Sequence, residues 1–231
     1  MKFEKIVFLI SIISICTVLV TTQLQTQDEI STLVNNSGPH IGTTVAHNYG
    51  LDGSGIIVSV IDTGVDFTHP DLLGLGLEGK VIGGYDFIDN DETPEDSNGH
   101  GTQVAGIIAS NGELKGIAPN SKILAYRVSE DGESVSSNLI IKAIEKSIED
   151  NANIINISLG INQTNTKLDQ VVTKAVQNNI FVVTAAGNFG PESSTIGSPA
   201  INPDVITTGA TFNDVSSSLV STFKIKEQQF N

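Results

Sequence analysis

Short runs rich in β-branched residues alternate along the chain with segments of helical character, and this alternation restricts the fold more than any other feature. The runs are bounded by Gly, Pro, Asn or Asp and are typical of buried strands; they cover residues 55–61, 121–128, 153–159, 180–186 and 204–210. The helical segments between them cover 101–110, 135–151 and 167–179. Strands joined by helices form right-handed crossovers and a mostly parallel sheet covered on both faces. The sequence therefore predicts a three-layer α/β fold, with its chemistry at the carboxyl ends of the strands.

The chain is acidic, with a net charge of −14 from 26 acidic and 12 basic residues. This charge argues against nucleic acids and anionic membrane surfaces as partners and favours cations. The one cysteine, Cys16, lies in an N-terminal apolar run, so the predicted folded part has no cysteine for an internal disulfide. For an extracellular domain, a bound metal ion is the candidate for the missing cross-link.

The N-terminal apolar run spans residues 6–20, follows a basic flank and is succeeded by polar residues. This pattern predicts a signal peptide over 1–22, or alternatively an uncleaved membrane anchor through residues 6–20. Residues 23–55 are polar and rich in turn formers, and we interpret them as a lead-in segment. We therefore expect a protein that is secreted or anchored at the outer face of the cell membrane.

Two polar residues stand where predicted elements end or begin. Asp62 follows the first apolar run in "VSVIDTG", where a buried carboxylate is costly unless it has a partner. His100 opens a predicted helix in "NGHGT", between Gly99 and Gly101, which leave room beside the ring. A helix N-terminus disfavours imidazolium, so a nearby carboxylate is needed to hold the tautomer and stabilise the charged ring. We expect Asp62 and His100 to form an acid–base pair.

Two further strand ends carry groups suited to peptide chemistry. Asn188, in "TAAGN", can point its side-chain amide at a developing oxyanion. The run "INISLG" ends in Ser158, Leu159 and Gly160, whose bare backbone edge suits pairing with an extended peptide.

An acidic loop, "YDFIDNDETPEDSNGHG", precedes His100 and offers oxygen ligands only. The candidate ligands, of the type that a hard cation requires, are Asp86, Asp89, Asp91, Thr93 and Glu95. The loop predicts a structural Ca²⁺ site, and the alternative is a solvated acidic loop.

The motifs "VIDTGVDFTHPDL", "NGHGTQVAGIIAS", "ISLG" and "AAGN" resemble the successive signatures of the subtilisin-like serine proteases, in the order of that family. The resemblance implies a peptidase domain over 41–231 with a subtilisin-like fold, which acts as a serine endopeptidase on polypeptides. It implies Asp62 as the acid that orients His100, and His100 as the general base and acid. It implies Asn188 as the oxyanion donor. The acidic loop is similar to the calcium loop of the thermitase-like branch.

The resemblance also assigns the substrate-binding edges. Ser158, Leu159 and Gly160 would bind the substrate backbone on one side, and the segment that begins at Gly132 would form the opposite edge. The sequence does not determine the oligomeric state.

The chain departs from the family at the nucleophile. In the family, the nucleophilic serine lies in a G-T-S-M-A-like motif that opens a later helix. No such motif occurs here, so we expect a C-terminally incomplete domain that is inactive by itself. Ser198, in "TIGSPA", stands where the family has a structural loop, and we do not expect it to be the nucleophile. A later helix would pack against Ala105, Gly106 and Ala109.

Two other functions fit parts of the sequence. A truncated chain or pseudoprotease would at most bind peptides. "DTG" is also the signature of aspartic proteases, in which two carboxylates share a proton, so Asp62 in a homodimer is a remote alternative.

Overall fold

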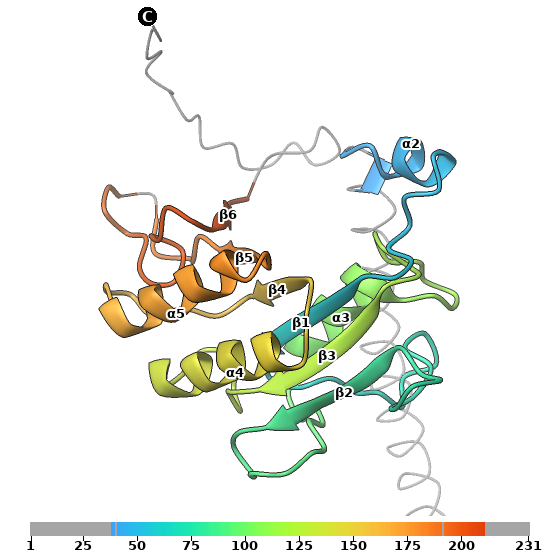
Figure 1. The fold of residues 1–231 in the computed structure, drawn as a ribbon, viewed down its shortest axis with the longest axis horizontal. Coiled ribbons are helices and arrows are strands. Elements are labelled where there is room, and N and C mark those ends of the chain that lie inside the picture. Colours follow the sequence, from blue (N-terminus) through green and yellow to red (C-terminus); the bar gives the residue numbers. More distant parts are fainter. Residues whose placement is uncertain (1–37, 40, 191, 211–231) are drawn as a thin grey trace, which may run out of the picture.

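The computed structural model describes residues 38–39, 41–190 and 192–210 (Figure 1). The predicted signal peptide or anchor, most of the N-terminal half of the lead-in segment, and residues 211–231 lie outside this range, so the predicted bounds 1–22, 23–55 and 41–231 stay predictions. Every helix in the described part of the chain is too short or too polar to cross a membrane.

In the described part of the chain, six parallel strands form one sheet in the order β2-β3-β1-β4-β5-β6. Their bounds are β1 Ile57–Asp62, β2 Val81–Asp86, β3 Lys122–Arg127, β4 Ile154–Ile157, β5 Phe181–Ala185 and β6 Ile206–Thr208. The five predicted strands are confirmed. β2 was not predicted, because Gly83 and Gly84 interrupt its β-branched pattern.

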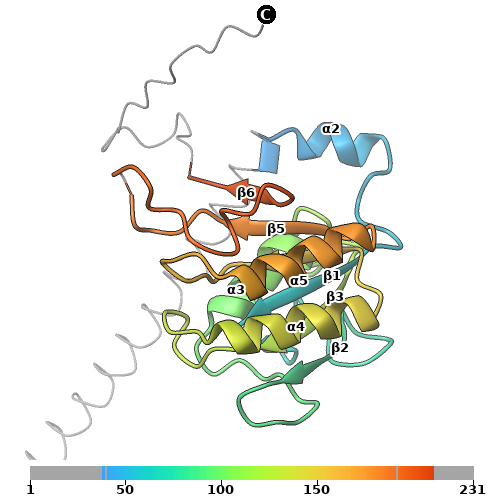
Figure 2. The ribbon, with the colours of Figure 1, turned by 60° about the vertical axis from the view of Figure 1, so that its left-hand side comes forward.

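Three helices cover the two faces of the sheet, and the three-layer α/β prediction is confirmed (Figure 2). α4 (Ser137–Glu149) and α5 (Thr166–Gln177) pack side by side on one face, and α3 (His100–Ala109) packs on the other against β1 and β3. A short helix, α2 (Thr43–Asn48), lies in the lead-in segment, where the sequence predicted none, and none of its residues is buried.

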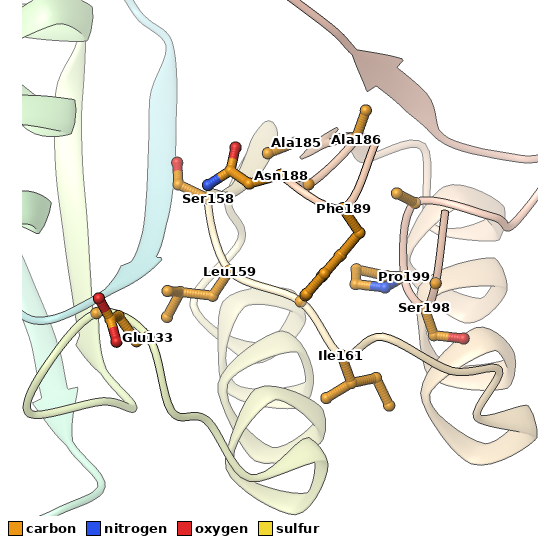
Figure 3. Close-up of a pocket in the computed structure, with 15 residues that line it drawn as sticks. Glu133, Ser158, Leu159, Ile161, Ala185, Ala186, Asn188, Phe189, Ser198 and Pro199 are labelled. Atoms are coloured by element: carbon orange, nitrogen blue, oxygen red, sulfur yellow. The ribbon is translucent and has the colours of Figure 1, made fainter. Parts of the chain in front are cut away.

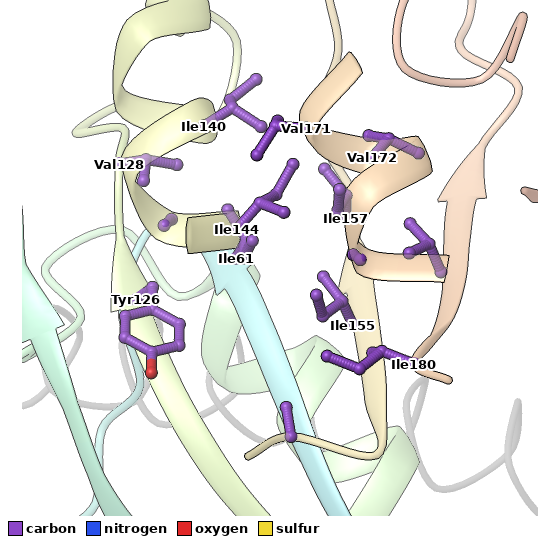
Figure 4. Packing of buried hydrophobic residues seen from close by; sticks show 14 of the residues in the cluster. Ile61, Tyr126, Val128, Ile140, Ile144, Ile155, Ile157, Val171, Val172 and Ile180 are labelled. Carbon is purple, nitrogen blue, oxygen red and sulfur yellow. The ribbon is translucent and has the colours of Figure 1, made fainter. Parts of the chain in front are cut away.

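The larger core lies between the sheet and the helices α4 and α5 (Figure 4). Ile140 and Ile144 recur on one face of α4 and pack against Ile61 of β1 and Ile157 of β4. Each such burial stabilises the fold by about 1.5–3 kcal/mol. Asn165 begins α5, where its side-chain oxygen accepts a hydrogen bond from the Leu168 amide. These contacts fix the strands whose carboxyl ends carry the predicted site.

The smaller core lies between α3 and the sheet. It bears on the expectation that a later helix packs against this helix. Ala105 and Ala109 are fully buried in a cluster with Val58 and Val60 of β1. Ala105 and Ala109 therefore face the sheet and are not left for a later helix to cover, whereas Gly106 is partly exposed, and the packing of a later helix on it stays a prediction. Small residues on this face let α3 approach β1 closely, which brings its first residue to the end of that strand.

Candidate active site

The structure brings Asp62 and His100 together. Asp62 is the last residue of β1 and has no exposed surface, whereas 43% of the His100 side chain is exposed at the start of α3. His100 Nδ1 lies 2.7 Å from Asp62 Oδ1. Because Asp62 is an acceptor, Nδ1 carries the proton and Nε2 is left as the free base. The pair therefore has the orientation that a general base requires.

The carboxylate of Asp62 is held at a cost in electrostatic energy. Burial raises the pKa of Asp62, and the hydrogen bonds from His100 and from the Thr63 amide, at 2.7 Å, offset part of this rise. Oδ2 is buried and has no hydrogen-bond partner among the described residues. A buried carboxylate beside one imidazole is typical of a site that favours chemistry over stability.

Two glycines allow the strand end and the helix start to approach. A Cβ at Gly101 would lie 2.1 Å from the carbonyl oxygen of Gly64 and 3.1 Å from the Cβ of Asp62. Gly64 has a φ of 103°, and a Cβ there would lie 2.7 Å from the carbonyl oxygen of Glu95. Only glycine fits at these two positions without a main-chain shift.

Asp96 lies behind the pair, and the sequence reasoning missed it. Its carboxylate accepts hydrogen bonds from the side chain of Thr63, the amides of Asn98 and Gly99, and both the amide and the hydroxyl of Thr102. Burial would raise the pKa of Asp96, but these hydrogen bonds outweigh it and lower the pKa. The sequence offered one signal for Asp96: an acidic residue lies shortly before a helix whose N-cap, Gly99, has no side chain to accept from the free amides.

The predicted substrate-binding residues and Asn188 line one cavity of about 380 Å³ (Figure 3). Ser158, Leu159 and Gly160 follow β4, and Asn188 follows β5 on the neighbouring strand end. Gly132 forms the opposite wall, and a Cβ on it would lie 3.7 Å from the Cβ of His100. The Gly132 wall of the cavity therefore lies next to the histidine.

The remaining walls of the cavity are mostly apolar, and Glu133 is the charged residue in its lining. Asn188 is exposed and follows Gly187, whose φ is 87°. Ser198 is buried, and its hydroxyl accepts a hydrogen bond from the Asn165 amide at 2.8 Å. Ser198 therefore holds a loop, in agreement with its expected structural role.

The predicted calcium ligands are not gathered around one point. Asp86 and Asp89 each place a carboxylate oxygen 2.7 Å from the same nitrogen of Arg127, and Asp91 accepts from the Thr93 amide. Within the described residues, no group of three or more His, Cys, Asp and Glu side chains is close enough to hold a metal ion. The guanidinium stands where a cation would lie between two of the carboxylates. The carboxylates of Asp86, Asp89 and Asp91 are thus held by donors of the protein and are not arranged around a shared cation position.

Comparison with known proteins identifies the relatives of this site. A sequence model described as the subtilase family, Peptidase_S8, matches residues 53–230. The chain belongs to the subtilase family. This confirms the resemblance drawn from the motifs, and it overturns the aspartic-protease alternative. In this subtilase, Asp62 pairs with an imidazole and not with a second carboxylate.

The similarity to individual subtilases covers most of this chain. Minor extracellular protease Vpr of Bacillus subtilis (strain 168) is 38% identical over 196 residues, which are 80% of this chain and 24% of Vpr. Thermophilic serine proteinase of Bacillus sp. (strain AK1) is 46% identical over 172 residues, 73% of this chain and 41% of that protein. The chain thus spans less than half the length of these two relatives.

A solved subtilase structure has the same fold. It is described as the crystal structure of a cold adapted subtilisin-like serine proteinase, with a TM-score of 0.61 and 38% identity. The match covers 70% of this chain and 56% of that chain. The subtilisin-like fold is therefore confirmed for this subtilase.

Proposed function

We propose that this chain provides the acid–base pair, the oxyanion donor and a substrate pocket of a serine endopeptidase. The observation that carries the proposal is the contact between the fully buried Asp62 and the half-exposed His100 at the carboxyl end of the central strand. Membership of the subtilase family supports it.

The proposed reaction uses His100 Nε2 to take the proton of a serine hydroxyl as that oxygen attacks the scissile carbonyl. His100 then returns the proton to the leaving amine, and Asp62 stabilises the imidazolium between the two steps. The amide of Asn188 and backbone N–H groups stabilise the oxyanion. Among the described residues the His100 ring is hydrogen-bonded to Asp62 and to no serine, and we propose that the nucleophile lies outside them.

The pocket suggests the class of substrate. Its walls of Leu159, Phe189 and Pro199 suit an apolar side chain of an extended polypeptide, whose backbone would pair with Ser158 and Gly160. Glu133 would favour a basic residue in a neighbouring position of the peptide.

The test is covalent labelling by a serine-reactive phosphonate together with hydrolysis of casein by the whole gene product. We expect stoichiometric labelling of the active product, with the label on a serine outside residues 38–39, 41–190 and 192–210. His100→Ala should lower kcat by roughly 10⁴-fold or more. His69→Ala is the matched control, because His69 accepts from the Asp71 amide in a loop and does not contact Asp62.

Other outcomes of this test separate the alternatives. A phosphonate label that peptide mapping places on a serine within residues 38–39, 41–190 or 192–210 would contradict the assignment of the nucleophile to residues outside the described ones. Peptide binding without hydrolysis by the whole product would favour a pseudoprotease. An unchanged kcat in His100→Ala would overturn the proposed mechanism.

We also propose secretion, because the relative Vpr is named an extracellular protease and the N-terminal run has the pattern of a signal peptide. N-terminal sequencing of the protein from the medium tests cleavage near residue 22. Retention of residues 6–20 in a membrane fraction would favour the anchor.

Calcium binding by the loop over 86–95 stays a prediction of the sequence pattern. Calorimetric titration of the purified protein with Ca²⁺ tests it. Binding that is lost in Asp91→Asn would support a site that forms around the ion, and absence of binding heat and of any shift in melting temperature would contradict it.

A further inference from the structure

The carboxylate of Asp96 connects the two elements that carry the acid–base pair. Its Oδ1 accepts from Thr63 Oγ1, which belongs to the residue directly after Asp62, at 2.9 Å. Its Oδ2 accepts from the amide and the hydroxyl of Thr102, in the first turn of α3, at 2.9 and 2.5 Å. One side chain therefore binds the end of β1 and the start of α3 together.

The start of α3 depends on this carboxylate for its cap. The N-cap residue, Gly99, has no side chain, and no side-chain cap bond is made from that position. The Asp96 carboxylate instead accepts hydrogen bonds from the amides of Gly99 and Thr102. A carboxylate at a helix N-terminus is favoured both by the free amides and by the helix dipole.

The contact with Thr63 reaches further than a helix cap does. The Thr63 amide donates to Asp62 Oδ1, the same oxygen that accepts from His100, and Thr63 Oγ1 accepts from the Gly101 amide at 2.9 Å. A displacement of Thr63 would therefore move both the acceptor oxygen and the residue that follows the histidine.

We propose that Asp96 is a positioning residue, which acts through Thr63 and Thr102 to hold Asp62 Oδ1 and His100 Nδ1 in hydrogen-bonding geometry. This proposal rests on the proposed function only in that the pair is catalytic; the geometry itself can be measured without turnover. Since Asp96 does not contact the imidazole in the described structure, its effect is indirect.

The test is Asp96→Asn in the 231-residue chain with ¹⁵N-labelled histidine. Asparagine keeps the shape, but it presents one acceptor oxygen and an NH₂ group to three backbone amides, so at least one amide loses its partner. We expect the downfield Nδ1–H resonance of His100 to weaken and its exchange with water to become faster by about tenfold or more, from the loss of charge-assisted hydrogen bonds.

Asp52→Asn is the matched control. The carboxylate of Asp52 also orders a loop, by accepting from the amide and hydroxyl of Ser54 and from the side chain of Asn120. It makes no contact with the acid–base pair. This variant removes the same charge from the chain and should leave the His100 resonance unchanged.

Thr63→Val tests the positioning effect of Asp96 separately from the effect of its charge. It also provides the test if Asp96→Asn does not fold. Valine has nearly the same shape, keeps Asp96 ionised and removes the link to Asp96 and to Gly101. We expect the same change in the His100 resonance as for Asp96→Asn. A folded Asp96→Asn or Thr63→Val variant with the exchange rate of the wild type would overturn the proposal. Failure of the whole product to hydrolyse casein would instead count against the proposed function.

Discussion

Substitution of Gly101 by alanine places two known effects in opposition. Alanine is favoured over glycine in a helix by about 1 kcal/mol. Here the new Cβ would lie 2.1 Å from the carbonyl oxygen of Gly64 and 3.2 Å from Asp62 Oδ1. Overpacking costs about 1–3 kcal/mol, and a contact with main chain belongs at the upper end, which leaves a net destabilisation of about 2 kcal/mol.

Gly106 offers a matched control in the same helix. A Cβ at Gly106 meets no atom within 4 Å apart from its chain neighbours and the backbone of its own helix, so Gly106→Ala should show the helix preference alone and stabilise by about 1 kcal/mol. Thermal unfolding followed by circular dichroism measures both variants. For a domain of this size about 1 kcal/mol shifts the melting temperature by roughly 2–4 °C, so we expect Gly101→Ala roughly 4–8 °C below the wild type and Gly106→Ala roughly 2–4 °C above it.

A Gly101→Ala variant as stable as Gly106→Ala would refute the reasoning. It would mean that the turn from Asp62 to Gly64 yields to the added methyl group. A second reading comes from the Nδ1–H resonance of His100, which should be lost in Gly101→Ala and kept in Gly106→Ala.

Three other substitutions test the buried polar groups. Asp62→Asn should raise the melting temperature at neutral pH. The raised pKa of Asp62 means that the folded wild type loses stability as the pH rises above the ordinary aspartate pKa of about 4; an equal difference between variant and wild type at pH 3 and pH 7 would contradict this. Arg127→Leu should cost about 3 kcal/mol in denaturant unfolding, because it leaves the buried carboxylate of Asp86 without its partner. Tyr126→Phe should cost about 1.5 kcal/mol in the same assay, since the hydroxyl of this buried residue donates to Asp150 at 2.6 Å; a cost near zero would show that water replaces the bond.

The sequence predicted the elements whose pattern is local. β1, β3, β4 and β5 read as apolar runs, and α4 and α5 read as helices with one apolar face. β2 was not predicted, because its glycines are required by a close approach to the neighbouring strand, β3. A Cβ at Gly84, whose φ is 148°, would lie 1.8 Å from the carbonyl oxygen of Ala125, and such a requirement is invisible in a local pattern.

The candidate site divides in the same way. Asp62 and His100 could be paired because each lies at the end of a predictable element and because the motifs resemble a known family. The sequence shows that Asp96 lies shortly before a helix start, but the roles of Asp96 and Arg127 arise from contacts with Thr63 and Asp86, which lie 33 and 41 residues away along the chain. The carboxylates of one loop therefore cannot be told apart in the sequence. In the structure, Asp96 caps the start of a helix and Asp86 binds a guanidinium.

The strand order has a consequence for synthesis. β1 is translated first, yet the strand on one side of it, β3, begins only at Lys122, and the strand on its other side, β4, begins at Ile154. At about 5–20 residues per second, the ribosome needs roughly 3–12 s after Asp62 to reach Lys122. During this interval the apolar segment of β1 has no neighbouring strand on either side, and Asp62 lacks its pairing with β3. We therefore expect the edges of β1 to be open to mispairing until β3 has been synthesised, and His100 is translated before either strand that flanks β1.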